Sequence, residues 1–519
     1  MKPIRLMAGF FTVGIWTLLS RVMGFVRDIM IAAYLGTGPV AEAFLVAFSL
    51  PNLFRRFFAE GAFNMAFVPM FSKKLEGLEG DDDARKFAQD AFIGLGGILT
   101  IFTIFGIIMM PALVTMMASG FIGTDRFDLT VYYGRIAFPY ILFISLSALL
   151  SGVLNATGRF VAAAAAPVLL NIVFVITLVI AAIAGGLDAI QIGTWLAYAV
   201  PLAGIAQLAL VWVAAKRAGF ALYPGIPTLT PDLKRLAIIA APAALAGGVV
   251  QINLLVGRQV ASFFDGAVAW LNYADRLYQL PLGVVGIAIG VVLLPDLSRR
   301  LRAGDEAGGK DAFNRASELC LALTIPAAVA LAVIPLPLVS VLYERGAFGS
   351  SDSAATALAV AIYGLGLPAF VMQKTLNPLF FAREDTKRPF YYALVALVLN
   401  AALAIGLSPF IGFIAAAVGT SLTGWATVFL LWRGSRQMGN AAHFDTRFKQ
   451  RLWRIIGASA GMGIVLIGAA WILDPWLNTP TIRYGALALL VGIGISSYFG
   501  IGQMIGAFRL GEIRHALRR

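Results

Sequence analysis

The sequence predicts an all-α polytopic membrane protein with about fourteen transmembrane helices, arranged as two lobes of six helices followed by two C-terminal helices. Of its residues, 60% are hydrophobic and only 13% are charged, whereas soluble domains average roughly 45–50% and about 25%. Apolar stretches of about 20 residues, each long enough to cross a hydrocarbon core, recur along the whole chain. Two short motifs also reappear at one fixed spacing, which indicates an internal duplication.

Each predicted helix begins where an apolar segment follows a polar loop. These segments begin near residues 8, 40, 87, 130, 161, 190, 235, 266, 312, 354, 390, 412, 453 and 482. The first carries Arg21, Arg27 and Asp28 and has no small-residue cleavage site, so we expect a helix of the mature protein and not a signal peptide. The second contains Pro51 before Asn52, where a kink is expected. The second and eighth segments are longer than a bilayer requires.

The duplication is visible in two pairs of short segments. Val68–Leu75 resembles Leu294–Leu301, since both have proline in second place and a basic pair near the end. Leu154–Ala156 matches Phe380–Ala382 at the same shift of 226 residues, and a basic loop follows each. Parallel repeats are a known plan of transporters. We therefore assign residues 1–218 to an N-terminal lobe with helices 1–6, residues 219–440 to a C-terminal lobe with helices 7–12, and residues 441–519 to helices 13 and 14 with a basic tail.

The net charge of +13 does not indicate binding to nucleic acid, because most Lys and Arg residues gather in alternate loops. The loops between them hold only Arg126, Arg345 and Arg483. This asymmetry follows the positive-inside rule, so both termini and the basic loops are expected in the cytoplasm.

Nine cations lie within or beside predicted helices, where a charge costs roughly 2.5–3.5 kcal/mol at a helix centre. They are Arg21, Arg27, Arg55, Arg56, Arg135, Arg258, Arg276, Arg315 and Lys374. Fewer acids accompany them, namely Asp28, Glu42, Glu60, Asp90 and Asp275. A watery cavity with surplus arginine suits an anionic, phosphorylated ligand, because guanidinium holds phosphate oxygens in pairs and stays protonated. Structural ion pairs and snorkelling are the alternative, which we favour for Arg135 and Arg315.

Neither a metal site nor a cofactor is expected. The lone Cys320 excludes an intramolecular disulfide and is interpreted as part of the core. His443 and His515 lie in separate polar segments, which argues against a histidine-based zinc centre.

Several motifs carry a resemblance to one known family. They are Ser20–Asp28, Ala41–Phe44, Leu50–Phe63, Tyr273–Leu277, Leu294-Pro295 and Phe381–Pro389. Together these segments, which extend over essentially the whole chain, resemble the signatures of the MurJ (MviN) family of lipid II flippases.

This resemblance implies the multidrug/oligosaccharidyl-lipid/polysaccharide (MOP) exporter fold, with a cationic cavity and a groove for a polyprenyl tail along the last two helices. The residues that match the family's cavity cations are Arg21, Arg27, Arg55 and Arg276, with Lys374 as a further candidate. Supporting or gating roles are implied for Asp28, Glu42, Asn52, Arg56, Glu60 and Asp275.

The same resemblance implies a function. A member of this family would move undecaprenyl-diphosphate-linked peptidoglycan precursor from the inner to the outer leaflet of the bacterial cytoplasmic (inner) membrane, by alternating access and driven by the membrane potential. The implied partners are lipid II, membrane lipids and the cell-wall synthesis machinery, with the protein itself a monomer.

Two alternatives remain at this point. An exporter of another polyprenyl-linked saccharide, or of drugs, would share the fold, although a pump for cationic drugs should line its cavity with acids. A membrane enzyme acting on polyprenyl phosphates could use Asp81-Asp82-Asp83 to bind metal, but this run lies in a short charged segment that we interpret as a solvated loop. We therefore expect a transporter and not an enzyme.

Overall fold

The computed structural model describes residues 6–55, 62–77 and 80–507, and this part of the chain is built from helices. It divides into two compact units, which we call unit 1 and unit 2. Unit 1 comprises Met1–Ala269 and Gly346–Phe348, and unit 2 comprises Trp270–Arg345 and Gly349–Arg519. The predicted lobe borders at residues 218 and 440 come from the sequence repeat, whereas the two units are defined by their compactness in space. The lobe borders therefore stay predictions.

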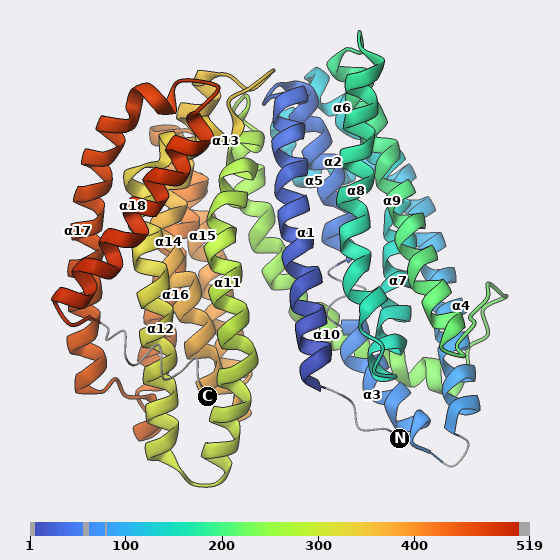
Figure 1. Cartoon of the computed structure of the whole chain (residues 1–519). Coiled ribbons are helices and arrows are strands. Elements are labelled where there is room, and N and C mark those ends of the chain that lie inside the picture. Colours follow the sequence, from blue (N-terminus) through green and yellow to red (C-terminus); the bar gives the residue numbers. More distant parts are fainter. Residues whose placement is uncertain (1–5, 56–61, 78–79, 508–519) are drawn as a thin grey trace. The chain divides into compact units, whose positions relative to one another are not determined.

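Unit 1 contains ten α-helices within the described residues. They are α1 (Leu6–Leu35), α2 (Pro39–Arg55), α3 (Ala62–Leu75), α4 (Gly80–Ile108), α5 (Met110–Met117), α6 (Asp125–Ala137), α7 (Tyr140–Ala156), α8 (Val161–Ala184), α9 (Ala189–Arg217) and α10 (Pro231–Ala261). Helix α1 packs against α8, α2 against α6, and α9 against α7 and α8 (Figure 1). Their facing side chains form one apolar core, which includes Phe44, Tyr140 and Phe174.

The helices of unit 2 begin with α11 (Ala267–Arg302), whose first three residues belong to unit 1. The others are α12 (Glu306–Val333), α13 (Pro335–Tyr343), α14 (Ser350–Phe381), α15 (Lys387–Ile411), α16 (Ile414–Ser435), α17 (Thr446–Leu477) and α18 (Arg483–Met504). Helix α14 packs between α12 and α16, while α17 lies against α12 and α18. The pair α17 and α18 is drawn in red in Figure 1.

The all-helical membrane architecture is confirmed. Ten helical segments among the described residues are long and apolar enough to cross a membrane. All of the predicted helix starts fall within a helix or a few residues from one. The number of fourteen spans stays a prediction.

One predicted loop is wrong. Helix α4 begins at Gly80, so Asp81, Asp82 and Asp83 form its first turn and not a loop, although Asp81 and Asp82 are exposed as expected. Carboxylates are favourable there because they face the positive end of the helix dipole. The Asp83 carboxylate accepts a hydrogen bond from Lys74 Nζ at 2.9 Å, and Lys74 also pairs with Asp232 at 3.0 Å, which links α3, α4 and α10.

The predicted duplication is borne out by the helix bounds. When α1, α4 and α8 are shifted by 226 residues, they fall within one residue of the bounds of α10, α12 and α15 at both ends. The short helix α5 likewise returns as α13, and α6 with α7 returns as the single helix α14. The two copies therefore share one order of elements from α1 to α16.

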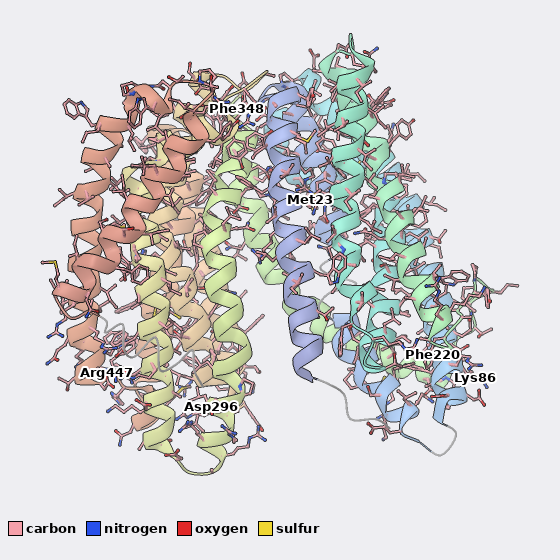
Figure 2. All side chains as sticks on the ribbon, in the orientation of Figure 1. Met23, Lys86, Phe220, Asp296, Phe348 and Arg447 are labelled. Carbon is pink, nitrogen blue, oxygen red and sulfur yellow. The ribbon has the colours of Figure 1, made fainter. Side chains whose placement is uncertain are left out.

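A cluster of charges holds α17 on α12. The Glu318 carboxylate, 7% exposed, lies 3.6 Å from Arg447 Nε and 3.4 Å from Arg451 Nη1, and it also pairs with Arg315. Arg315 binds Asp445 as well, which confirms its interpretation as a structural cation. Arg447 is labelled in Figure 2.

Cys320 lies on α12, two residues beyond Glu318. It is fully buried, so its interpretation as part of the core is confirmed.

Candidate functional site

The best-defined polar site in unit 1 surrounds Arg27 on α1. Its Nη2 donates to Asp28 Oδ1 at 2.7 Å and its Nε donates to the same oxygen at 2.9 Å. Its Nη1 donates to Asn171 Oδ1 on α8 at 3.0 Å. Arg27 and Asp28 are 6% and 3% exposed, so the pair is held inside the helix bundle.

Aromatic rings and a second helix fix this arginine in place. The guanidinium carbon lies 5.8 Å from the centre of the Phe48 ring and 5.6 Å from that of Phe174, within the range of cation–π attraction. Asn171 Nδ2 donates to the backbone oxygen of Ser20 at 2.9 Å, so Asn171 ties α8 to α1 at both Ser20 and Arg27. Figure 2 shows Met23 on α1, one turn before Arg27.

Arg21 differs from Arg27 although both lie on α1. It is exposed, and it stands near the middle of a helix of 30 residues. A charge at such a depth faces water or a polar ligand in preference to lipid, because hydrocarbon cannot solvate it. Within unit 1, the side chain of Arg21 is therefore exposed and can contact a ligand. The charge of Arg27, in contrast, is already neutralised by the Asp28 carboxylate.

Glu42, on α2, belongs to a separate cluster. Its Oε2 accepts from Arg126 Nη1 at 3.0 Å, and its Oε1 accepts from the backbone N–H of Val268 at 3.1 Å. Arg126 also pairs with Asp265 at 2.9 Å and lies 4.7 Å from the centre of the Phe121 ring. Glu42 thus joins α2 to α6 and to the start of α11, and the structure does not bring it to Arg27.

The second half of α2 carries Asn52 and Arg55 beyond the internal Pro51. Asn52 Nδ2 donates to the backbone oxygen of Phe48 at 2.8 Å, so its side chain stays on its own helix. Arg55 is partly buried at the end of α2. Two further predicted site residues, Arg56 and Glu60, lie outside the described residues.

Unit 2 contributes Asp275 and Arg276 on α11 and Lys374 on α14. Asp275 accepts a hydrogen bond from Gln279 one turn further on, and Arg276 is partly buried. Lys374 is exposed although it stands well inside a helix of 32 residues that is long and apolar enough to span a membrane. Lys374 in unit 2 and Arg21 in unit 1 are thus both exposed cations inside long apolar helices.

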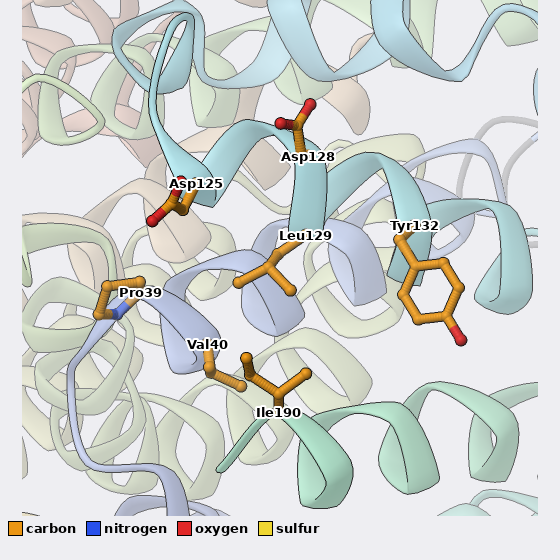
Figure 3. Close-up of a pocket in the computed structure, with 7 residues that line it drawn as sticks. All are labelled: Pro39, Val40, Asp125, Asp128, Leu129, Tyr132 and Ile190. Atoms are coloured by element: carbon orange, nitrogen blue, oxygen red, sulfur yellow. The ribbon is translucent and has the colours of Figure 1, made fainter.

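Two pockets lie away from these cations. One, of about 580 Å³, is lined by ends of α2, α6 and α9 (Figure 3). Its polar rim consists of Asp125 and Asp128, the wrong charge for an anionic ligand. The other, of about 450 Å³, is an apolar groove in unit 2 walled by α12, α14, α16 and α17, with Trp425, Phe448 and Leu452 among its residues. This groove suits a hydrocarbon chain.

Sequence reasoning missed two polar residues of these clusters. The sequence pattern places Arg126 in a loop, yet it is 8% exposed and pairs with a residue 84 positions away. Asn171 is the other, and the signal for it is an asparagine within the long apolar segment of α8, which indicates a polar partner opposite.

Comparisons with known proteins fit this architecture. The family model of the lipid II flippase MurJ matches residues 31–489. A probable lipid II flippase MurJ of Rhizobium tropici is 43% identical over 521 residues, which cover 99% of this chain and 97% of the relative. A probable lipid II flippase MurJ of Vibrio cholerae serotype O1 is 34% identical and covers 99% of this chain and 98% of its own.

Solved structures show the same fold. A lipid II flippase MurJ in an inward closed conformation superposes with a TM-score of 0.79 and 25% identity, covering 95% of this chain and 98% of that one. An inward-facing MATE family transporter of the MOP superfamily superposes with a TM-score of 0.68 over 81% of this chain and 95% of its own, at 14% identity, and supports the fold alone. On the family match and these full-length relatives, the chain belongs to the MurJ family of lipid II flippases.

Proposed function

We propose that this protein is a lipid II flippase, which moves the undecaprenyl-diphosphate-linked peptidoglycan precursor from the inner to the outer leaflet of the cytoplasmic membrane by alternating access. Membership of the MurJ family supports this function. In this proposal the chain is a multi-pass transporter of the inner membrane, and lipid II is its substrate.

One observation supports the binding mechanism most directly. Arg21 and Lys374 are exposed on the surfaces of their units although each lies inside a long apolar helix, Arg21 near its middle and Lys374 about two turns before its end. A cationic side chain within an apolar helix is stable where it faces water or an anion and not lipid. We propose that Arg21, Arg27 and Arg55 of unit 1 and Arg276 and Lys374 of unit 2 bind the diphosphate during transport, with Arg27 exchanging part of its contact with Asp28 for the substrate.

The lipid tail requires a different surface. The apolar groove beside α17 offers a path for a polyprenyl chain that never leaves a hydrocarbon environment. The tail is proposed to run along α17 and α18, so that only the polar head group has to cross through the protein.

The driving force in this proposal is the membrane potential. An inside-negative potential favours outward movement of negative charge by about 2.3 kcal/mol per elementary charge per 100 mV. The charge bias of the loops supports cytoplasmic positions for both termini. We further propose that the protein works as a monomer alongside the cell-wall synthesis machinery.

Arg276→Ala tests the role of the cavity cations. We expect the variant to accumulate to normal levels and to lose lipid II transport, because one contact to the diphosphate is removed while the helix remains. The measurement is the fraction of lipid II accessible to an externally added enzyme, in cells where the variant is the sole flippase. Arg135→Ala, which removes an exposed cation whose one hydrogen bond among the described residues is to the backbone oxygen of Ile107, is the matched control. Full transport by Arg276→Ala would remove this residue from the site.

A further inference from the structure

Two arginines share one tyrosine ring where α13 ends and α18 begins, within unit 2. The guanidinium carbons of Arg345 and Arg483 lie 5.7 Å and 5.3 Å from the centre of the Tyr484 ring. Arg483 Nη1 donates to the backbone oxygen of Glu344 at 3.1 Å, and Arg345 Nη2 donates to that of Val341 at 3.1 Å. Two like charges are therefore fixed side by side on a half-exposed surface.

Neither guanidinium has a carboxylate partner in the part of the chain that the structure describes. The nearest acid in sequence, Glu344, accepts a hydrogen bond from Ser353 Oγ at 2.6 Å instead. The Nε atoms of Arg345 and Arg483 are buried and have no hydrogen-bond partner among the described residues. Burial lowers the pKa of Arg345, Tyr484 offsets part of this effect, and the adjacent charge of Arg483 again acts to lower the pKa. An anion bound here would offset both costs.

The start of α18 adds to the positive field. Arg483 is its first residue, and no side chain caps this end of the helix. Helix N-termini carry a partial positive charge, so a cation at this position is unfavourable unless an anion accompanies it. A Cβ added at Gly485 would meet no atom within 4 Å, so there is open space beside this first turn.

The surroundings indicate that the anion belongs to a lipid. Tyr484 is 48% exposed, and Trp476 and Ile482, which lie in the segment before it in the sequence, are exposed as well. Tyrosine and tryptophan gather at the level of lipid head groups. Arg345 and Arg483 are also two of the three basic residues outside the predicted cytoplasmic loops, where the positive-inside rule disfavours them.

We propose that Arg345 and Arg483, with the start of α18, bind the phosphate or diphosphate group of a membrane lipid at this end of unit 2. The same chemistry could come from an anionic phospholipid or from the transported lipid after it has crossed. The second source rests on the proposed flippase function, whereas the first does not.

The test uses the full-length protein in detergent and native mass spectrometry, with three lipids added in turn. Phosphatidylglycerol and undecaprenyl diphosphate are the probes, and phosphatidylcholine gives the background. The variant is Arg345→Gln/Arg483→Gln, and Arg135→Gln/Arg302→Gln removes the same charge from exposed sites elsewhere. The undecaprenyl diphosphate titration is repeated in the Arg276→Ala background, which separates this site from the transport site.

We expect the Arg345→Gln/Arg483→Gln variant to bind at least one anionic probe about tenfold more weakly, since charge-assisted hydrogen bonds are lost. The control should bind like the wild type. A loss confined to phosphatidylglycerol assigns a phospholipid, and a loss confined to undecaprenyl diphosphate assigns the transported lipid. Equal affinity of wild type, variant and control for both probes would overturn the proposal.

Folding is checked by thermal unfolding. If the glutamine variant does not fold, Arg345→Lys/Arg483→Lys takes its place, because it keeps both charges and loses the paired geometry of guanidinium. Its binding should fall several-fold, and unchanged binding would contradict the assigned site. The phosphatidylglycerol result holds whether or not Arg276→Ala abolishes transport, so the two proposals can fail separately.

Discussion

The two copies of the duplication share most of their helix bounds, whereas charged residues of the first copy are replaced at the equivalent positions of the second. In the first copy α1 carries the pair Arg27 and Asp28, whereas the positions 226 residues later on α10 are Asn253 and Leu254. Apolar packing and turns set the helix bounds, so both copies keep them. Asn253 and Leu254 carry no charge, so the Arg27–Asp28 pair has no counterpart at these positions of the second copy.

A second pair of positions shows the same contrast. Glu42 and Arg126 bind each other in the first copy, and their equivalents are Val268 and Asp352. In unit 2, Asp352 accepts a hydrogen bond from Trp270 Nε1 at 3.0 Å instead. The residue at position 126 is thus bound to Glu42 in the first copy, whereas its equivalent Asp352 is bound to Trp270, the equivalent of Phe44, in the second.

The largest effect is expected from Arg27→Met. This change leaves Asp28 buried without its cation, and breaking a buried pair in this way costs about 3–5 kcal/mol. The free energy of unfolding of the purified protein, compared with that of the wild type, measures it.

A matched variant sharpens the comparison. Arg27→Asn/Asp28→Leu gives the first copy the residues of the second, and it should recover most of the stability because no unpaired charge remains. It should still fail in the lipid II accessibility assay. A double variant that transports normally would show that the pair is structural.

An intermediate effect is expected at the second cluster. Arg126→Gln removes the cation shared by Glu42 and Asp265 and should lower the free energy of unfolding by about 1.5–3 kcal/mol. A cycle with Glu42→Val, the residue of the second copy, should show that the two losses are not additive, since the side chains touch. Strict additivity would mean that the contact contributes nothing.

The smallest effect is expected from Trp270→Phe, which gives the second copy the residue of Phe44. The variant loses the hydrogen bond to Asp352 but keeps a ring beside Phe413, now 5.0 Å from the centre of the Trp270 ring. The free energy of unfolding should fall by about 0.5–1.5 kcal/mol, and lipid II transport should be unchanged. Loss of transport in a stable variant would assign Trp270 a part in the mechanism.

Features that depend on the length of apolar segments and on the internal repeat of the sequence were predictable from the sequence. The all-helical class, the positions of the spans and the 226-residue shift each follow from patterns along the chain. The pairing of buried charges does not, because it depends on which helices meet. Arg126 reads as a loop cation until α6 is placed beside α2, and Asp81 to Asp83 read as a loop until α4 is seen to begin at Gly80.

The predicted cations were also separated by the structure in a way that the sequence does not reveal. Arg21 and Arg27 are six residues apart on one helix, yet one is exposed and the other is enclosed with Asp28 and Asn171. The difference comes from α8, which covers one face of α1. Sequence spacing could show that the two residues point in different directions, but not which direction is covered.

The agreement of helix bounds between the two copies has a consequence for how this chain can change. An α-helix turns by about 100° per residue, so one residue inserted within a helix would rotate every later side chain away from its neighbours. Since α1, α4 and α8 return as α10, α12 and α15 with ends displaced by at most one residue, no net insertion or deletion separates these three pairs of helices. In these segments the two copies have diverged by substitution at constant length. Single residues, and not rearranged segments, therefore distinguish their chemistry.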